Sequence, residues 1–501
     1  MHRERFELPT NKAQFEPQRV SRLTRSTGEV NCLDMKQTQP EQPSETGNDR
    51  YGHDVSFREA LVVWLRVAAL SFGGPAGQIA VMHRILVDEK KWISESRFLH
   101  ALNYCMLLPG PEAQQLATYI GWLLHRTAGG LAAGLLFVLP GFLSILALSV
   151  LYAGFHELSV VQAVFFGIKA AVLAVVVEAV LRIGKRALKN GYMHVIAAAA
   201  FVAIFFLDVS FPLIIAAAAL VGLLGSRLHP GKFVVIKGYQ PEVGVATPAV
   251  DAMLHDGRRD HARPSWGRTL RVAAFWSALW FVPLGALILA LGSDNVFTQI
   301  GLFFSKLAVV TFGGAYAVLA YMAQEAVQNY GWLAPGEMLD GLGMAETTPG
   351  PLIQVVQFVA FIGAFRDAGG LDPFTAGVLA SVLVTWVTFV PCFLWIFVGA
   401  PYIESLRDNR ALSAALSAVT AAVVGVVLNL AVWFSLHVVF GEVDVVQAYG
   451  LKLHVPVLAT LDPASLVLAV GALVAMLRLH VGMIPVIFTS ALLGAAWFML
   501  V

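Results

Sequence analysis

The sequence predicts an all-α polytopic membrane protein of about 13 transmembrane helices, arranged as two inverted-topology repeats with broken or re-entrant helices. Three observations lead to this prediction. The 501 residues are 57% hydrophobic and only 13% charged. Long apolar runs fill most of the chain, and helix-breaking motifs inside those runs recur 240 residues later. The net charge of +1 gives no reason to expect a nucleic acid as partner.

The start of the chain differs from the rest. Residues 1–56 are polar, rich in Arg, Gln, Glu, Thr and Pro, and contain no apolar stretch of the kind found in a signal peptide. We expect them to form a disordered cytoplasmic tail, with Met35 as an alternative start of translation. The cysteines, Cys32, Cys105 and Cys392, have neither paired nor metal-ligand spacing. We therefore expect no disulfide, no metal and no cofactor.

Apolar runs of about 17 to 25 residues mark the expected spans. In order, they are 60–82, 98–124, 130–152, 160–181, 194–207, 211–224, 269–291, 296–322, 339–365, 374–398, 412–439, 464–479 and 483–500. A polar segment separates the first six spans from the rest and is the one domain boundary that we expect. The predicted parts are a tail 1–56, a first repeat 57–225, a cytoplasmic linker 226–268, a linker transmembrane helix 269–291 and a second repeat 292–501.

Two motifs occur once in each half. Phe72-Gly73-Gly74 returns as Phe312-Gly313-Gly314, and Pro109-Gly110-Pro111 returns as Pro349-Gly350-Pro351, both 240 residues later. Because unrelated motifs share one spacing, an internal duplication is indicated. One extra span separates the halves, so the second repeat should enter the membrane from the opposite side. Transporters with inverted repeats carry their binding site near the midplane, at the repeat interface.

The positive-inside rule favours a cytoplasmic N-terminus and a periplasmic C-terminus. With this orientation most basic residues outside the spans face the cytoplasm. They are those of the tail and the linker, together with Arg126, Arg182, Lys185, Arg186, Lys189, Arg407, Arg410 and Arg478. The loop between the first two spans disagrees with the rule, because its four basic residues would face outward. These are Arg84, Lys90, Lys91 and Arg97.

Both repeated motifs would break a helix at membrane depth. Proline removes an amide donor and glycine adds backbone freedom, and a bilayer tolerates irregular backbone only beside a cavity or inside protein. Arg66 and Lys306 each stand six residues before a Phe-Gly-Gly motif. Because freed amides beside a cation suit an anion, the sequence predicts an anion site at the breaks. The alternative is that both cations snorkel or pair with a carboxylate such as Glu59.

Further polar residues lie near the breaks. Glu112 and Glu346 could each orient a cation, gate the site or take up a proton, and Glu112 could equally stabilise a helix N-terminus. Gln114 and Gln354 hold matched repeat positions and could donate to oxygens or cap helices. The complete candidate site is Arg66, Phe72, Gly73, Gly74, Pro109, Gly110, Pro111, Glu112, Gln114, Lys306, Gly313, Gly314, Glu346, Pro349, Gly350, Pro351 and Gln354.

One more apolar run carries charges. Lys169 and Glu178 lie nine residues apart in the run 160–181, on different helical turns, so a direct pair between them is not expected. Lys169 is either a second intramembrane cation or a residue near a helix end.

No enzyme motif is found. The sequence lacks a Gly-x-Ser-x-Gly elbow, a His-Glu-x-x-His pair, a phosphate-binding Gly-x-x-x-x-Gly-Lys-Ser/Thr loop and a dinucleotide fingerprint after a strand. Without a nucleotide-binding domain in this sequence, secondary transport is the default expectation, and no residue is predicted to be catalytic.

Five stretches together are typical of one family. They are Ser71–Pro75, Leu107–Ala117, Gly129–Gly141, Thr311–Tyr316 and Thr347–Pro351. On these motifs the chain resembles the chromate ion transporters in their long, two-domain form, nearly everywhere from residue 57 onward except in the linker. The halves have diverged, because Leu352 replaces the position of Glu112 and Pro391 does not keep the spacing of 240.

The resemblance implies an inner-membrane secondary transporter that exports chromate, is energised by the proton motive force and confers chromate resistance. A carrier for sulfate or another oxyanion is the runner-up, because chromate and sulfate are both tetrahedral dianions of similar size. A membrane scaffold or sensor, docking a partner through the linker, is the alternative from another class. Deletion of Glu242–Asp260 separates the two classes, since a transporter should still move its anion. A homodimer is compatible with the sequence.

Overall fold

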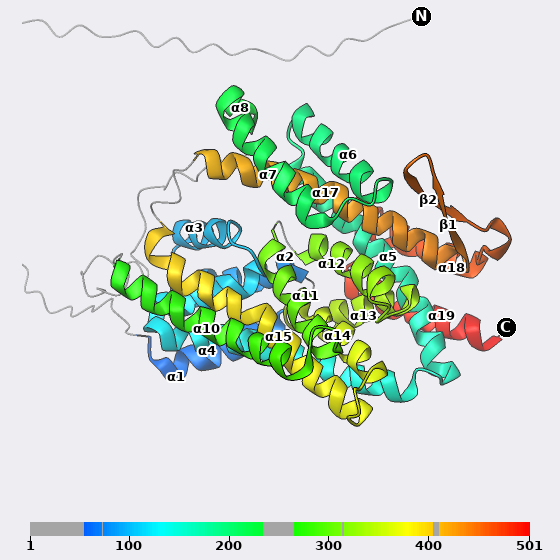
Figure 1. Ribbon diagram of the computed structural model, residues 1–501, viewed down its shortest axis with the longest axis horizontal. Helices are drawn as coiled ribbons and strands as arrows, with labels where there is room; N and C mark the ends of the chain where they lie inside the picture. The colour runs from blue at the N-terminus through cyan, green and yellow to red at the C-terminus, as the bar shows by residue number, and fades with distance from the viewer. Residues whose placement is uncertain (1–54, 73, 234–264, 313–314, 404–409, 501) are drawn as a thin grey trace, which may run out of the picture. The chain divides into compact units, whose positions relative to one another are not determined.

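The computed structural model describes residues 55–72, 74–233, 265–312, 315–403 and 410–500 (Figure 1). The predicted tail, most of the linker, Gly73, Gly313 and Gly314 lie outside the described residues. The predicted all-α membrane fold is confirmed, with one small β-hairpin added to it.

The first half contains eight helices and one π-helical turn. They are α1 (Phe57–Leu70), α2 (Gly74–His83), the π turn η1 (Arg84–Glu89), α3 (Glu95–Cys105), α4 (Glu112–Phe155), α5 (Ser159–Ala187), α6 (Gly191–Phe205), α7 (Phe211–Leu228) and the short α8 (Pro230–Phe233). Helix α4 is kinked at His125 and Arg126, whose backbone angles are not helical, and therefore has two arms, 112–124 and 127–155.

The second half repeats this order after a connecting helix. Its elements are α10 (Trp266–Leu291), α11 (Val296–Val310), α12 (Ala315–Gln324), η3 (Glu325–Asn329), α13 (Pro335–Thr347), η4 (Leu352–Gln354), α14 (Val355–Arg366), α15 (Pro373–Gly399), η5 (Ala400–Tyr402), α17 (Arg410–Val439), β1 (Val443–Ala448), β2 (Leu451–Pro456), η6 (Leu458–Thr460), α18 (Pro463–Leu477) and α19 (Met483–Leu500). The antiparallel hairpin β1–β2 has no counterpart in the first half.

The first apolar run folds back on itself instead of crossing. Lys90, which follows the π turn, places its Nζ 2.9 Å from Oε1 of Glu59 near the start of α1. Arg66 of α1 binds Glu89 at 2.6 Å. The end of η1 and the start of α1 therefore lie side by side, and the chain reverses its direction between α1 and α2. Each arm has about 15 residues and is about 20 Å long, too short to cross the hydrocarbon core.

Three other predicted spans form the same kind of hairpin. In the first half, His125 at the end of the first arm of α4 binds the carbonyl of Val55 at 2.7 Å. In the second half, Lys306 of α11 lies over the ring of Tyr321 in α12, and Arg366 at the end of α14 binds the carbonyl of Trp332, just before α13. The predicted spans 60–82, 98–124, 296–322 and 339–365 are therefore re-entrant hairpins.

The hairpins of the two repeats enter from opposite ends. Val55 and His125 lie at one end of the molecule, here called the proximal end. The second arm of α4 leads from there to Tyr152, whose hydroxyl binds Asp340 in the first turns of α13. The second repeat's hairpin therefore starts at the other end, the distal end. Because α10 runs from the proximal to the distal end, it inverts the second repeat relative to the first.

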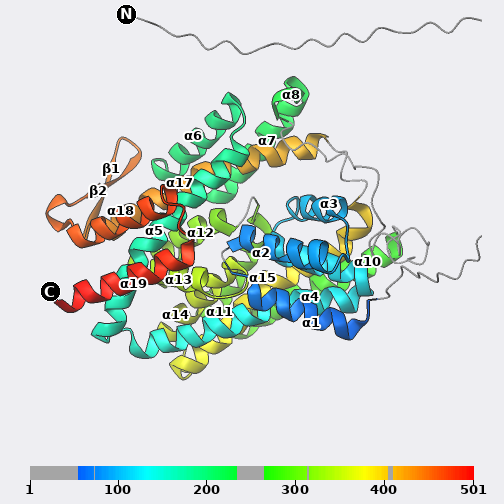
Figure 2. The same cartoon turned by 180° about the vertical axis from the view of Figure 1, so that it is seen from behind.

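The two repeats exchange helices. Helix α5 of the first repeat packs against α18 and α19 of the second, and α17 of the second repeat packs against α6 and α7 of the first (Figures 1 and 2). Seven described helices are long and apolar enough to cross a membrane, and four shorter apolar helices accompany them. The first repeat, the second repeat and α10 are thus held together by one shared core.

The expectation that the loop 84–97 violates the positive-inside rule was wrong. That expectation assumed that the first span crosses the membrane, which would place Arg84, Lys90, Lys91 and Arg97 on the outer side. Since α1 and α2 form a re-entrant hairpin, the loop returns to the proximal end, as the Lys90–Glu59 ion pair shows. A break halfway along an apolar run allows either path, and hydropathy alone does not distinguish the two.

Cysteine labelling in intact cells tests this topology. With Cys32, Cys105 and Cys392 replaced by serine, Lys91→Cys and Thr127→Cys should react with a membrane-impermeant maleimide from the same side. Tyr449→Cys at the tip of the hairpin, which is fully exposed, should react from the opposite side. Labelling of Lys91→Cys together with Tyr449→Cys would contradict the re-entrant hairpin.

A candidate anion site between the repeats

The tips of the re-entrant hairpins meet and bond across the two repeats. The Gly110 amide donates to the carbonyl of Thr311 at 2.8 Å, and the Gly350 amide donates to the carbonyl of Ser71 at 2.9 Å. Each Pro-Gly-Pro turn is thus tied to the residue that precedes the other repeat's Phe-Gly-Gly motif. Among the described residues, the breaks of the two repeats therefore lie close together.

Both central glycines are required by the geometry. Gly110 has φ of +117° and Gly350 has φ of +108°, values that L side chains rarely adopt. A Cβ on Gly350 would lie 2.8 Å from the Cα of Gly141 in α4, and one on Gly110 would lie 2.9 Å from Sγ of Cys392 in α15. Each turn therefore rests on the proline-containing helix of the opposite repeat.

The helix ends at the breaks are not electrostatically equivalent. Hydroxyl groups of Ser71, Thr311 and Thr347 donate to carbonyls of their own last helical turns at 2.5 to 2.9 Å. Those C-terminal carbonyls are therefore partly satisfied. The N-caps of α4 and η4 are Pro111 and Pro351, whose side chains cannot cap the amides that follow. The breaks thus present uncapped, positively polarised helix N-termini, which favour an anion.

Buried amide side chains surround these N-termini. Gln114 donates from Nε2 to Thr118 at 3.1 Å, and Gln354 donates to Gln357 at 2.7 Å and to Thr385 at 3.2 Å. Within the described residues, the Oε1 atoms of Gln114 and Gln354 have no hydrogen-bond partner. Unpartnered buried polar atoms are typical of a site that binds a polar ligand. Because these free atoms are acceptors, an anion would be bound by the Nε2 donors of the same side chains.

Two carboxylates stand beside the same breaks. Glu346 is only 2% exposed; its Oε1 accepts a hydrogen bond from the Tyr316 hydroxyl at 2.8 Å, and its Oε2 has no partner among the described residues. Glu112 lies half-buried in the first turn of α4. Because a carboxylate repels an anion, these residues and a bound dianion compete electrostatically unless a proton neutralises the acid.

The two predicted cations do not point at the breaks in this conformation. Arg66 is half-exposed and bound to Glu89 at 2.6 Å. Lys306 is exposed, and its Nζ lies 5.5 Å from the ring centre of Tyr321. The buried face of α1 is formed by Val63, Trp64, Val67 and their neighbours, on the other side of the helix from Arg66. A direct role of either cation in holding the anion stays a prediction.

Sequence reasoning missed several buried polar residues, two of them beside the breaks and one, Asp340, farther along α13. Gln78 donates from Nε2 to the carbonyl of Gly350 at 2.6 Å, and Tyr316 binds Glu346. Asp340 is buried, and its Oδ1 lies 3.4 Å from Nζ of Lys169. A carboxylate inside the run 339–365 was the signal that could have revealed Asp340. The expectation that Lys169 and Glu178 are not paired agrees with the structure, because Glu178 binds Arg182.

Inverted repeats, re-entrant hairpins and polar groups buried where those hairpins meet define a polytopic membrane transporter. Comparison with known proteins gives the family. A model of the family described as "Chromate transporter" matches residues 58–223 and 298–495. The chain belongs to the chromate transporter family. Membership of this family points to a transporter rather than an enzyme.

Curated relatives cover most of the chain. It is 28% identical over 393 residues to the "Chromate transport protein" of Cupriavidus metallidurans, covering 78% of this chain and 86% of that protein. It is 30% identical over 394 residues to the "Chromate transport protein" of Pseudomonas aeruginosa, covering 77% and 83%. An "Uncharacterized transporter" of Methanocaldococcus jannaschii is 25% identical, covering 75% and 83%. No solved structure matches.

Substitution of Gly350 tests the contact between the Pro-Gly-Pro turn and α4. Gly350→Ala should lower the thermal unfolding midpoint of the purified protein by several degrees, because a strained backbone costs about 1–3 kcal/mol and the methyl group also meets Gly141. Gly267→Ala, where a Cβ would meet nothing within 4 Å, is the matched control and should leave the midpoint unchanged. Equal midpoints for the two variants would show that the turn does not need this approach.

Proposed function

We propose that this protein is a secondary active transporter that exports chromate from the cytoplasm, is energised by the proton motive force and confers chromate resistance. The observation that supports it most directly is the meeting of uncapped helix N-termini at the interface of the inverted repeats. Membership of the chromate transporter family and the printed names of two curated relatives give the substrate. A tetrahedral oxyanion with two charges is the kind of ligand that such N-termini bind.

The dianion would lie between the two pairs of hairpin tips. The proposed ligands are the backbone amides that follow Pro111 and Pro351, together with the Nε2 donors of Gln114 and Gln354, which lie at equivalent places in the two repeats. These donors would turn from Thr118 and Gln357 toward the anion. Phe72 and Gly74 would form the opposite wall. Gly73, Gly313 and Gly314, which the sequence also predicts for the site, lie outside the described residues. Glu112 and Glu346 would set the charge of the site, so that binding of the dianion and ionisation of these acids oppose each other.

The charge distribution supports a cytoplasmic proximal end. With the re-entrant hairpins taken into account, the basic loop 84–97, Arg126 and the basic end of α5 all lie at that end, as the positive-inside rule requires. The protein would reside in the bacterial inner membrane with its N-terminus in the cytoplasm and its C-terminus in the periplasm. Alternating access would come from movement of one repeat against the other.

Arg66 would leave Glu89 to bind the anion in another conformation. Two variants separate this role from a structural ion pair. Arg66→Ala should abolish chromate uptake into inverted vesicles, whereas Glu89→Gln, which breaks the same ion pair, should retain at least half of it. The half-exposed pair is worth about 0–1 kcal/mol, so its loss alone should not unfold the protein. Equal residual transport in the two variants would contradict the proposed role of Arg66 in binding the anion. Lys306→Ala, at the equivalent position of the second repeat, tests Lys306 in the same assay.

Uptake of labelled chromate into inverted membrane vesicles, energised and then uncoupled, tests the function itself. Energy-dependent accumulation that excess sulfate scarcely reduces is the expected result for a chromate exporter. Accumulation abolished by sulfate would favour the second candidate, a general oxyanion carrier, since the two dianions share shape and charge. Absence of accumulation in wild-type vesicles that contain the protein would contradict transport of chromate altogether.

A further inference from the structure

A charged pocket lies away from the breaks, where the first repeat contacts α13 at the distal end. Its volume is about 430 Å³. Helices α4 and α5 supply Tyr152 and Lys169, His156 follows the end of α4, and α13 supplies Glu337 and Asp340. The walls therefore come from both repeats, and any change in their charges acts on the contact between the repeats.

Asp340 is the deepest ionisable group of this pocket. Its side chain is only 4% exposed. Its Oδ2 accepts a hydrogen bond from the Tyr152 hydroxyl at 2.9 Å, and its Oδ1 lies 3.4 Å from Nζ of Lys169 without a hydrogen bond from any described residue. Lys169, on the pocket wall, is 31% exposed. The carboxylate is thus buried against a single cation and keeps one oxygen free to receive a proton.

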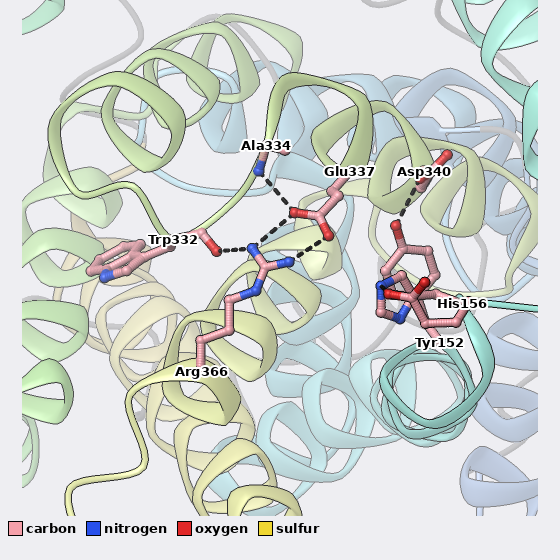
Figure 3. A network of polar contacts seen from close by, with 8 residues as sticks. Tyr152, His156, Trp332, Ala334, Glu337, Asp340 and Arg366 are labelled. Atoms are coloured by element: carbon pink, nitrogen blue, oxygen red, sulfur yellow. Dashed lines mark hydrogen bonds and ion pairs between the residues drawn. The ribbon is translucent and has the colours of Figure 1, made fainter. Parts of the chain in front are cut away.

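The other charged groups that face the pocket are already compensated. Glu337, one turn before Asp340, binds Arg366 of α14 through both carboxylate oxygens at 2.9 and 2.6 Å and also accepts the Ala334 amide at 2.8 Å (Figure 3). His156 lies 3.0 Å from Glu157. Of the two carboxylates on the pocket wall, Glu337 and Asp340, it is therefore Asp340 whose negative charge is balanced, within the described residues, only by the ion pair with Lys169, at 3.4 Å.

We infer that Asp340 is a proton-binding site, reached through this pocket from the distal compartment, and that Lys169 and the proton alternate as its partner. A hydronium ion would transfer its proton to Oδ1, leaving water and a neutral carboxylic acid. Tyr152 can stay bound to Oδ2, while Lys169 loses its counter-charge and is released. This inference rests on the proposed function, because it names the site through which a proton drives anion export.

The position of the pocket links this proton to a conformational change. Helix α13 packs against α5, α4 and α17, so Asp340 joins the repeats at the distal end. Helix α3 holds the position in the first repeat that α13 holds in the second. In the described structure α3 is not packed against α17 or α5 as α13 is, and His100 occupies the position of α3 that corresponds to Asp340. Since the contact exists in one repeat only, breaking the Lys169–Asp340 pair would loosen the distal end alone and expose the site to that compartment.

Infrared difference spectroscopy of the purified protein tests the proton site without any substrate. The difference spectrum between mildly alkaline and mildly acidic pH, both above the pKa of about 4 at which exposed carboxylates take up protons, should contain the carbonyl band of a protonated carboxylic acid. We expect Asp340→Asn to lose that band and Glu157→Gln, a matched change of an exposed acid near the pocket, to keep it. In Lys169→Gln the band should persist to higher pH, because the cation that favours the carboxylate is gone. A band that Asp340→Asn retains, or that only Glu346→Gln removes, would overturn the assignment.

Transport in proteoliposomes then separates this inference from the proposed function. Asp340→Asn mimics the protonated state, so it should exchange labelled for unlabelled chromate at a rate within about threefold of wild type, yet fail to accumulate chromate when a pH gradient is imposed. Accumulation by Asp340→Asn equal to that of wild type would overturn the proton site. If wild-type protein itself moves no chromate, the proposed function fails, and the infrared result still decides whether Asp340 binds a proton.

Discussion

The structure depends on two backbone hydrogen bonds that cross between the repeats, from Gly110 to Thr311 and from Gly350 to Ser71. Backbone groups released by a broken helix must find partners within the membrane. Among the described residues, each repeat supplies the amide of its Pro-Gly-Pro glycine and the carbonyl of the residue before its Phe-Gly-Gly motif, and inversion brings each amide to the other repeat's carbonyl. The same two repeats interlock through the exchange of α5 and α17.

The same breaks create the electrostatics of the candidate site. Serine and threonine hydroxyls cover carbonyls at the helix C-termini, whereas proline at the N-caps leaves the amides of α4 and η4 uncapped. Among the described residues, the interface is therefore polarised toward an anion by helix N-termini and not by a buried cation. The nearby Glu112 and Glu346 oppose that polarity when ionised, and this opposition gives a physical basis for linking anion binding to proton binding.

The two repeats are equivalent in chain order but not in surroundings. Residues 338–346 of α13 are buried without interruption, whereas α3 buries only Phe98, Ala101, Tyr104 and Cys105. The second repeat's hairpins are thus packed tightly at the distal end, and those of the first repeat are looser at the proximal end. In a protein with inverted repeats, such a difference defines a conformation that is closed on one side, and its reversal gives the other state.

The sequence by itself determined the fold class, the positions of the apolar segments, the duplication and the resemblance to a family, because hydropathy and motif spacing are local properties. Lys169 also stood out, since a charge in an apolar run is visible without a structure. Only the tertiary structure decided that four of the runs turn back, that Arg66 binds Glu89 and that Lys169 binds Asp340. The hairpin Val443–Pro456 was not predicted either. The contacts of Arg66 with Glu89 and of Tyr152 with Asp340 join residues 23 and 188 positions apart, and no local pattern specifies which of several possible partners is met.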